Sequence, residues 1–166
     1  MSSNPAGDER ATPIPAGERV PSFSLARGDG QERFTEADLA GKTTVLVFYP
    51  FAFSPVCSDQ LSLYDAVREE FDAQGAVLYG VSCDAVWSQR AFQEKLGVSI
   101  EQLSDFEPKG AVCRAFGVYH PGGFPQRALV IIGPDGRVLW SHQAESPGDL
   151  PGANLIFDAL AGATAA

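Results

Sequence analysis

Two runs of apolar residues, with a helical pattern between them, constrain the fold of this chain more than any other feature. Residues 45–49 (VLVFY) and 76–82 (AVLYGVS) are continuously apolar and rich in β-branched and aromatic side chains, which is typical of strands buried on both faces. Apolar residues recur at helical spacing over residues 61–71, and Gly75 is placed to end that helix. Because a strand–helix–strand crossover is right-handed, we expect the two strands to be parallel.

The segments on both sides of this unit add further strands and helices. Residues 20–25 alternate between apolar and polar and are followed by a second short strand over residues 32–34, which predicts an N-terminal β-hairpin. Gly-Pro-Asp-Gly at residues 133–136 predicts a turn between two antiparallel strands. The remaining expected elements are a capped helical turn over residues 36–39, helices over residues 85–96, 108–116 and 154–160, and strands over residues 127–132 and 137–141.

These elements predict one α/β domain: a mixed central sheet flanked by helices, with an N-terminal β-hairpin extension. The 166 residues have room for a single domain, expected over residues 20–162. Residues 1–19 lack hydrophobic periodicity and predict a flexible arm, and residues 163–166 are expected to form a short tail. Sites in such sheets lie beyond the carboxyl ends of the parallel strands.

Charge and cysteine content exclude several classes of function. The 12 Lys and Arg residues against 21 Asp and Glu residues give a formal net charge of −9, which disfavours nucleic acid and anionic membranes as partners. No apolar run approaches the ~18 residues of a membrane helix, and the N-terminus lacks the features of a secretory signal. Three cysteines without a CxxC pair fit neither a disulfide scaffold nor a zinc site. We therefore expect a cytoplasmic protein with no metal and no cofactor.

Cys57 is the cysteine whose position best explains a reactive thiol. It follows a buried strand and a loop that contains Pro50 and Ser54, and it falls in the first turn of the next helix. Unpaired backbone N–H groups and the positive end of the helix dipole favour an anion there, such as a thiolate. Ser54 can offer a hydroxyl hydrogen bond from the same loop. The alternative is a small buried residue that only packs at the strand–helix junction.

The residues around Cys57 resemble the signature of the peroxiredoxin family. Pro50-x-x-x-Ser54-x-x-Cys57 matches the family pattern Pro-x-x-x-Thr/Ser-x-x-Cys, and the strand before it matches as well. The resemblance runs from about Gly17 to the last helix. It is strongest to the alkyl hydroperoxide reductase E group of actinobacteria, with the bacterioferritin-comigratory group next. Further matching segments are residues 103–106, 110–112, 115–119 and 127–131.

This resemblance implies a thioredoxin-like fold and thiol-dependent reduction of hydrogen peroxide and organic hydroperoxides. Cys57 would be the peroxidatic cysteine, which attacks the peroxide and becomes a sulfenic acid. Ser54 would hydrogen-bond the sulfur and the peroxide, while Pro50 would restrict and shield the loop. Arg127 would stabilise the thiolate and polarise the O–O bond. Related sequences often carry Glu where this chain has Gln60, so the glutamate that could shuttle a proton is missing. The family also implies a homodimer.

Three routes could return the sulfenic acid to a thiol. Cys83 ends the strand next to the strand that precedes Cys57, so it is the favoured internal resolving cysteine. The first turn around Cys57 would have to unwind for a disulfide between the two to form. Cys113 is a weaker candidate, because its apolar neighbours indicate a packed, inert thiol. The external route uses thioredoxin, mycoredoxin or a low-molecular-weight thiol as the reductant.

Two other functions are compatible with a reactive cysteine on this fold. A thioredoxin-like disulfide reductase would need a cysteine where the chain has Ser54. A non-enzymatic peroxide-sensing or chaperone module, in which oxidation of Cys57 changes a partner interface, is the alternative to the enzyme. Oxidation of Cys57 without turnover by any reductant would distinguish the sensor from the peroxidase.

Overall fold

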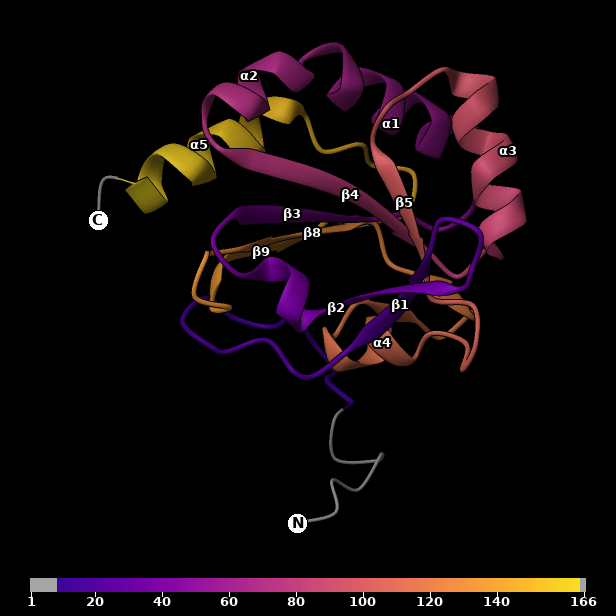
Figure 1. Ribbon diagram of the computed structural model, residues 1–166, viewed down its shortest axis with the longest axis horizontal. Helices are drawn as coiled ribbons and strands as arrows, with labels where there is room; N and C mark the ends of the chain where they lie inside the picture. Colours follow the sequence, from indigo (N-terminus) through magenta and orange to yellow (C-terminus); the bar gives the residue numbers. More distant parts are fainter. Residues whose placement is uncertain (1–8, 165–166) are drawn as a thin grey trace.

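A seven-stranded mixed sheet forms the centre of the protein (Figure 1). The computed structural model describes residues 9–164. The strands, in the order in which they lie across the sheet, are β2 (Glu32–Thr35), β1 (Ser24–Arg27), β5 (Glu101–Ser104), β4 (Ala76–Ser82), β3 (Thr43–Phe48), β8 (Ala128–Ile132) and β9 (Val138–Gln143). A separate antiparallel pair is formed by β6 (Tyr119–His120) and β7 (Phe124–Pro125).

Strands β3 and β4 contain the two apolar runs and lie side by side in parallel, which confirms the prediction. Their register pairs Val45 with Leu78 and Phe48 with Val81. On its other side β3 pairs antiparallel with β8, which continues through the predicted turn into β9. Because β3 lies between β4 and β8, the loop that follows it begins at the carboxyl end of a central strand. The predicted mixed sheet and its N-terminal hairpin are confirmed.

Helices cover the two faces of this sheet unequally. Helices α1 (Pro55–Ala66), α2 (Arg68–Ala73), α3 (Val86–Leu96) and α5 (Ala153–Thr164) lie on one face, and α4 (Ala111–Ala115) lies on the other (Figure 1). The expected turn after β2 is the 3-10 helix η2 (Glu36–Leu39), with its capping box formed by Thr35 and Asp38. None of the helices in the described part of the chain is long and apolar enough to cross a membrane.

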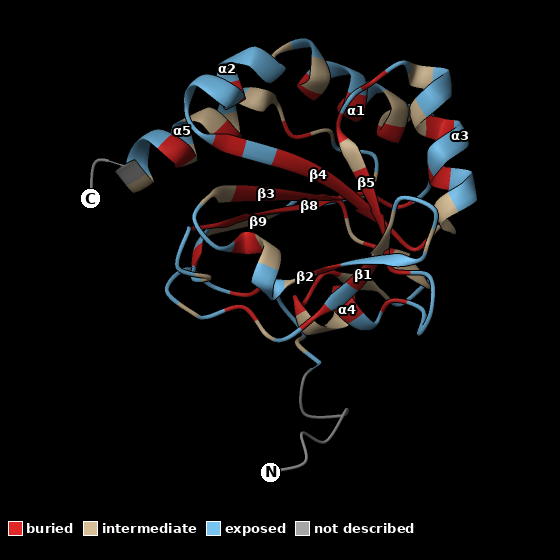
Figure 2. Cartoon of the chain, viewed as in Figure 1, coloured by how far each residue is buried: buried red, intermediate tan, exposed pale blue. Residues whose placement is uncertain are grey.

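The sheet separates two hydrophobic cores, because successive side chains of a strand point to opposite faces. Val45 and Val47 pack in one cluster, here called the α1 core, while Leu46 and Phe48 pack in the other, here called the α4 core. Figure 2 shows the buried residues, in red, concentrated in the strands between the two layers. Each buried cysteine belongs to one core or the other, which decides what it can contact.

The helix after β3 differs from its predicted form. The sequence pattern predicts one helix over residues 61–71, but the chain becomes helical at Pro55 and breaks at Val67, between α1 and α2. Proline is favourable at the first helical position because the N–H that it lacks would have no partner there. The earlier start places Cys57 inside the helix's first turn, in agreement with its predicted position.

Trp87 is exposed, although its hydrophobicity alone would place it on the buried side of α3. It is 64% exposed, whereas Gln89 and Phe92 are buried. Residues two positions apart in an α-helix are rotated by about 200° around its axis. A buried stripe through Gln89 and Phe92 therefore leaves Trp87 on the opposite side. A polar glutamine therefore takes the buried position that hydrophobicity alone assigns to tryptophan.

Strands β5, β6 and β7 are absent from the sequence prediction. Strand β5 reads EQLS and carries buried polar side chains, so no apolar pattern marks it. Its Gln102 accepts a hydrogen bond of 2.6 Å from the Tyr49 hydroxyl, which satisfies the amide oxygen inside the protein. Strands β6 and β7 have only two residues each, too short for periodicity to show.

The prediction of a flexible arm over residues 1–19 is wrong for residues 10–19. Residues 1–8 lie outside the described residues. The Arg10 N–H donates to the Arg114 carbonyl oxygen, and the Ile14 N–H donates to the Phe116 carbonyl oxygen, each at 3.0 Å. Ile14 is fully buried in the α4 core. It stands alone between two prolines, so no periodicity identifies it as a core residue.

Gly117 lies where this N-terminal segment packs on the body, and it supports a stability prediction. Its φ is +74°, and a Cβ atom there would lie 1.9 Å from the carbonyl oxygen of Thr12. We expect Gly117→Ala to lower the free energy of unfolding by about 3 kcal/mol, since the left-handed conformation costs alanine about 1 kcal/mol and the clash adds roughly 2 kcal/mol. Urea denaturation followed by circular dichroism measures the loss.

Gly75→Ala is the matched control for this prediction. Gly75 has a φ of +70°, but a Cβ atom there meets nothing within 4 Å. We expect this variant to lose only the conformational part, about 1 kcal/mol. Equal losses in the two variants would contradict the close approach of Thr12 to Gly117.

Candidate active site

The loop between β3 and α1 places Cys57 at the carboxyl end of the central strands. The Tyr49 N–H donates to the Val81 carbonyl oxygen at 3.0 Å, which continues the pairing with β4. The Ala52 N–H then donates to Oδ2 of Asp84 at 2.8 Å, so the loop is also tied to the residues that follow β4. Cys57 lies in the first turn of α1 and is fully buried in the α1 core.

Arg127 donates a hydrogen bond to the sulfur of Cys57. The Nη2–Sγ distance is 3.1 Å, although the two residues are 70 positions apart in the chain. Arg127 directly precedes β8, and the pairing of Ala128 with Phe48 brings it beside the end of β3. Its side chain is buried, with 2% of the residue exposed. The tertiary structure therefore joins two residues that sequence spacing alone does not connect.

Two further hydrogen bonds hold the guanidinium of Arg127 in place. Its Nε donates to the Pro147 carbonyl oxygen at 2.6 Å, and its Nη1 donates to Oε1 of Gln60 at 2.5 Å. Gln60 in turn donates to the Tyr64 hydroxyl at 3.2 Å, and that hydroxyl donates to the Pro151 carbonyl oxygen at 2.6 Å. Burial raises the pKa of Tyr64 to about 12, so the phenol stays neutral at physiological pH.

Arg127 is a buried cation without a carboxylate partner. Within residues 9–164, none of the ion pairs between basic and acidic side chains includes its guanidinium. Burying a charge without an opposite charge nearby is costly. An anionic sulfur on Cys57, already at hydrogen-bond distance, would balance this charge. The arrangement is therefore suited to stabilising negative charge that develops at this sulfur.

Ser54 and Pro50 lie in the loop that joins β3 to α1, the helix that contains Cys57. Ser54 is the N-cap residue of α1, and its carbonyl oxygen accepts the N–H and the hydroxyl of Ser58, each at 2.9 Å. The Ser54 hydroxyl forms no capping hydrogen bond with the helix, while Pro50 is buried. The N–H groups of the first turn have no intrahelical carbonyl to bind. The Ser54 hydroxyl and the first-turn N–H groups thus have no hydrogen bond within the helix, and their roles with a peroxide stay a prediction.

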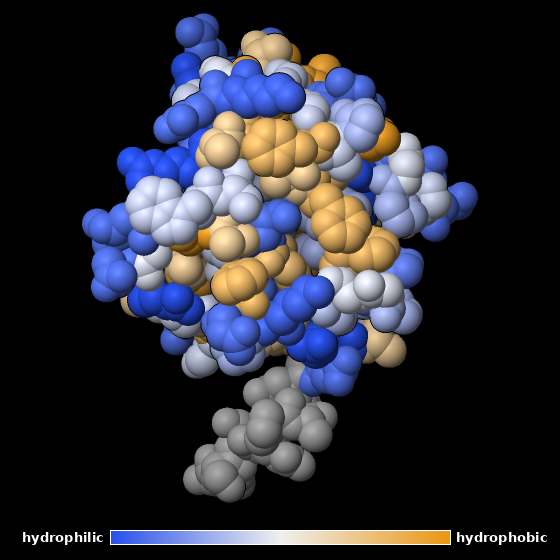
Figure 3. All heavy atoms as spheres, turned by 90° about the vertical axis from the view of Figure 1, so that its right-hand side faces the viewer, coloured by the Kyte–Doolittle hydropathy of each residue, from blue (hydrophilic) through white to orange (hydrophobic). Residues whose placement is uncertain are grey.

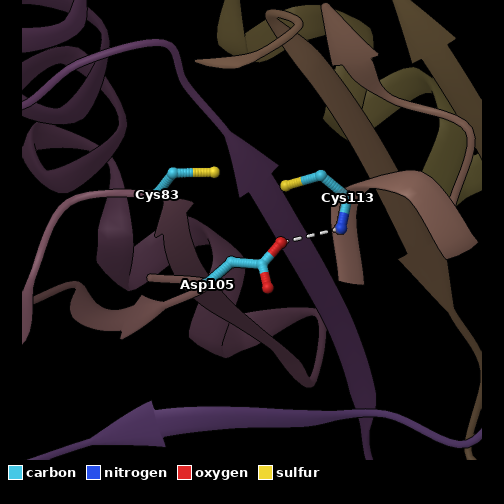
Figure 4. Close-up of side chains that lie close together, drawn as sticks. All are labelled: Cys83, Asp105 and Cys113. Carbon is cyan, nitrogen blue, oxygen red and sulfur yellow. Dashed lines mark hydrogen bonds between the residues drawn. The ribbon is translucent and has the colours of Figure 1, made fainter. Parts of the chain in front are cut away.

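Cys83 and Cys113 lie away from this group, in the α4 core. The predicted adjacency of β3 and β4 is correct, but Cys83 packs on the face opposite to Cys57. Its sulfur instead faces that of Cys113, with the Asp105 carboxylate beside both (Figure 4). Cys113 is fully buried, as the sequence predicts. A disulfide between Cys57 and Cys83 would require rearrangement of the sheet edge as well as of α1.

Sequence reasoning missed two groups that complete the site. Tyr64 lies four residues after Gln60 on α1, so helical spacing places their side chains together and could have indicated the pair. The Pro147 carbonyl, which accepts from Arg127, comes from the segment between β9 and α5. No motif in the sequence marks a backbone carbonyl for such a role.

Comparison with known protein families matches most of the chain. The model of the AhpC/TSA family matches residues 16–141, a span that includes the Cys57 loop, α1 and Arg127. The chain belongs to the AhpC/TSA family. This result confirms the resemblance to peroxiredoxins.

Curated relatives of this family member match between about two thirds and nine tenths of its length. It is 29% identical over 151 residues to alkyl hydroperoxide reductase E of Mycobacterium tuberculosis, a match that covers 90% of this chain and 97% of the relative. A putative peroxiredoxin bcp of Haemophilus influenzae is 34% identical over 108 residues, covering 64% of this chain and 67% of the relative. Both groups expected from the sequence are represented.

Solved structures of the family have the same fold. Peroxidoxin BcpB of Mycobacterium tuberculosis aligns with a TM-score of 0.76 at 28% identity, covering 92% of this chain and 97% of that structure. The AhpC of Enterococcus faecalis aligns with a TM-score of 0.80 at 26% identity, covering 90% and 92% respectively. The fold of this AhpC/TSA member is thioredoxin-like, and the protein is an oxidoreductase that reduces peroxides with a cysteine thiol.

Gln60→Glu is expected to lower the rate constant for alkylation of Cys57 at neutral pH by about tenfold, which corresponds to roughly 1.4 kcal/mol. Gln60 is buried and neutral, and its amide oxygen accepts from Arg127. A carboxylate at this place would share the guanidinium's positive charge and repel a thiolate on Cys57. The rate of Cys57 alkylation by iodoacetamide at pH 7 measures the loss.

The exposed Gln74, at the end of α2, provides the control for that measurement. Gln74→Glu adds the same charge to the surface, where water and salt screen it, so the alkylation rate of Cys57 should not change. Equal alkylation rates in Gln60→Glu and Gln74→Glu protein would show that a carboxylate at position 60 does not affect Cys57.

Proposed function

We propose that Cys57 is the peroxidatic cysteine of this peroxidase and that Arg127 is its principal electrostatic partner. The observation that supports this assignment is the 3.1 Å hydrogen bond from a buried guanidinium that has no carboxylate among its described neighbours. The same guanidinium can also donate to a peroxide oxygen on which negative charge develops. A cysteine that only fills the strand–helix junction would not need a buried cation against its sulfur.

The proposed chemical step is a displacement at oxygen. The Cys57 thiolate attacks the terminal oxygen of the hydroperoxide, and the O–O bond breaks as the S–O bond forms. Sulfur is oxidised to the sulfenic acid, and the departing alkoxide or hydroxide takes up a proton to become alcohol or water. Arg127 stabilises the negative charge of the attacking thiolate and that of the departing oxygen. The Ser54 hydroxyl and the N–H groups of the first turn of α1 orient the peroxide.

We propose an external thiol for the return of the sulfenic acid to a thiol. The first thiol condenses with Cys57 to a mixed disulfide and releases water, and a second thiol then releases Cys57 as a small disulfide forms. The position of Cys83 in the opposite core supports this route over the internal one. Thioredoxin, mycoredoxin and a low-molecular-weight thiol are the proposed reductants, and the cytoplasm, where such thiols are kept reduced, is the proposed location.

We also propose that two copies associate through the end of the molecule that carries the active-site loop. Phe51 and Phe53 in this loop are about half exposed. Figure 3 shows this end, where apolar side chains, in orange, interrupt a largely polar surface. Covering these rings with a second copy would remove their apolar area from water. Sedimentation at micromolar concentrations should show a dimer that Phe51→Asp weakens.

Treatment with one equivalent of hydroperoxide in the presence of dimedone tests the assignment of Cys57. Dimedone reacts with sulfenic acids, and peptide mass spectrometry locates the adduct. We expect the adduct at Cys57, with Cys83 and Cys113 unmodified, and we expect an added thiol to prevent it. Urea-unfolded protein should react far more slowly, because unfolding separates Arg127 from the sulfur.

Two outcomes would contradict the proposal. An adduct on Cys83 or Cys113 but not on Cys57 would reassign the peroxidatic cysteine. Equal reaction rates in folded and unfolded protein would show that the folded site does not activate the thiol. Formation of a Cys57–Cys83 disulfide would contradict the external route and support Cys83 as the resolving cysteine. Cys57 would still be the peroxidatic cysteine.

A further inference from the structure

Three buried side chains meet in the α4 core without contributing to the Cys57 site. Cys83 follows β4, Asp105 follows β5 and Cys113 lies on α4, and one sulfur or carboxylate oxygen from each lies within 4.8 Å of the other two. Figure 4 shows the two sulfurs directed toward each other across the gap, with the carboxylate below them. The elements that hold them are separate in sequence, so the tertiary fold creates this cluster.

The donor set of this cluster fits a dithiol better than a metal site. Within residues 9–164 no fourth cysteine, histidine or carboxylate joins the three, whereas structural zinc sites use four protein ligands. The carboxylate oxygens of Asp105 already accept the N–H groups of Val112 at 3.1 Å and Cys113 at 2.8 Å, which fixes them at the start of α4. Two facing thiols beside a fixed carboxylate are suited to thiol–disulfide exchange.

We propose that Cys83 and Cys113 form a second redox site, independent of Cys57, which closes to an intramolecular disulfide by exchange with a small-molecule disulfide. The sulfurs lie within 4.8 Å. A disulfide bond is about 2.05 Å long, so the sulfurs need to approach by no more than about 2.8 Å. Cys113 sits on a helix of only five residues, which can shift more readily than a central strand can.

Cys83 is the entry point of this site. A cavity of about 360 Å³ opens onto it, and its other walls include Asp84, Phe106 and Lys109. This volume accommodates a small disulfide that carries both charges, with Lys109 available for its carboxylate and Asp84 for its ammonium group. Cys113 is fully buried and does not line the cavity. The small molecule therefore reaches Cys83 first and Cys113 only through it.

The exchange takes place in two balanced steps. The Cys83 thiolate attacks one sulfur of the small disulfide, the S–S bond breaks, and the leaving thiolate takes up the proton that Cys83 lost. Cys113 then passes its proton to Asp105 and attacks the Cys83 sulfur, expelling a second small thiolate, which receives that proton. Two protein thiols are oxidised to one disulfide, and the small disulfide is reduced to two thiols.

Asp105 is needed for the second step because Cys113 does not ionise readily. Burial, the Cys83 thiol and the negative charge of Asp105 raise the pKa of the Cys113 thiol well above its usual range. Burial also raises the pKa of Asp105, which makes its carboxylate a stronger base than an exposed one. Closing the disulfide also withdraws both candidate resolving thiols from any reaction with Cys57.

The test uses Cys57→Ser protein equilibrated with glutathione disulfide and glutathione at varied ratios. We expect the loss of two free thiols, a mass lower by two hydrogens, and a peptide in which Cys83 and Cys113 are linked. Because Cys57 is absent, this result does not depend on the peroxidase assignment, and a failure here leaves that assignment intact.

Two further variants establish the order of the steps. With Cys113→Ala added, the reaction should stop at a glutathione adduct on Cys83. With Cys83→Ala added, Cys113 should stay unmodified in the folded protein. Thiols that stay free at every ratio, a glutathione adduct on Cys83 that persists beside an intact Cys113, or direct modification of Cys113 in the Cys83→Ala protein would each overturn the proposal.

Discussion

Cys57→Ser protein is expected to lose hydroperoxide reduction by about 10⁴-fold or more, the scale of losing a catalytic nucleophile. A serine hydroxyl ionises far above physiological pH even beside Arg127, so no anion is available to attack the peroxide. The substitution preserves the size of the side chain and leaves an acceptor for the Arg127 hydrogen bond, so the fold should be retained. Peroxide consumption in the presence of a thiol reductant measures the loss.

The double variant Cys83→Ser, Cys113→Ser is the control for that experiment. The first equivalent of peroxide needs only Cys57, so this variant should consume one equivalent in a rapid initial phase. An initial phase that survives in Cys57→Ser protein but disappears in the double variant would place the reaction in the α4 core. Circular dichroism and urea denaturation check that each variant is folded.

Arg127→Met is expected to lower the second-order rate constant for hydroperoxide reduction by about 10²–10³-fold, the usual cost of removing one fixed donor to a developing charge. The variant removes the hydrogen bond that Arg127 donates to the Cys57 sulfur, and with it the buried positive charge beside that sulfur. It also leaves the Oε1 atom of Gln60 without the hydrogen bond from Nη1. Stopped-flow measurement of the first turnover isolates this effect from the recycling steps.

Arg137→Met is the matched control, since Arg137 is exposed and lies directly before β9, at the end of β8 that is farther from Cys57. It removes the same formal charge, and it should change the rate constant by less than about twofold, because surface charges are screened. Arg127→Lys should recover only part of the loss, because an ammonium cannot reproduce the three directed bonds of the guanidinium. Equal rate constants for Arg127→Met and Arg137→Met would contradict the proposed electrostatic role.

The elements with strong local signals were predictable from the sequence. Strands β3 and β4, the turn before β9 and the positions of α3 and α5 follow from apolar runs, glycine turns and helical spacing. Strand β5 was missed because its buried Gln102 is stabilised by a partner on another strand. Ile14 was missed because its burial depends on α4 and β9, which come much later in the chain.

The sequence by itself determined that Cys57 begins a helix at the end of a buried strand, because apolar runs, prolines and helical spacing are local properties. It also determined membership of the family through the motif around that cysteine. Only the tertiary structure decided that Arg127 reaches Cys57 and that Cys83 faces Cys113 and not Cys57. The physical reason is that a strand sends alternate side chains into separate cores, so neighbouring strand ends do not imply neighbouring sulfurs.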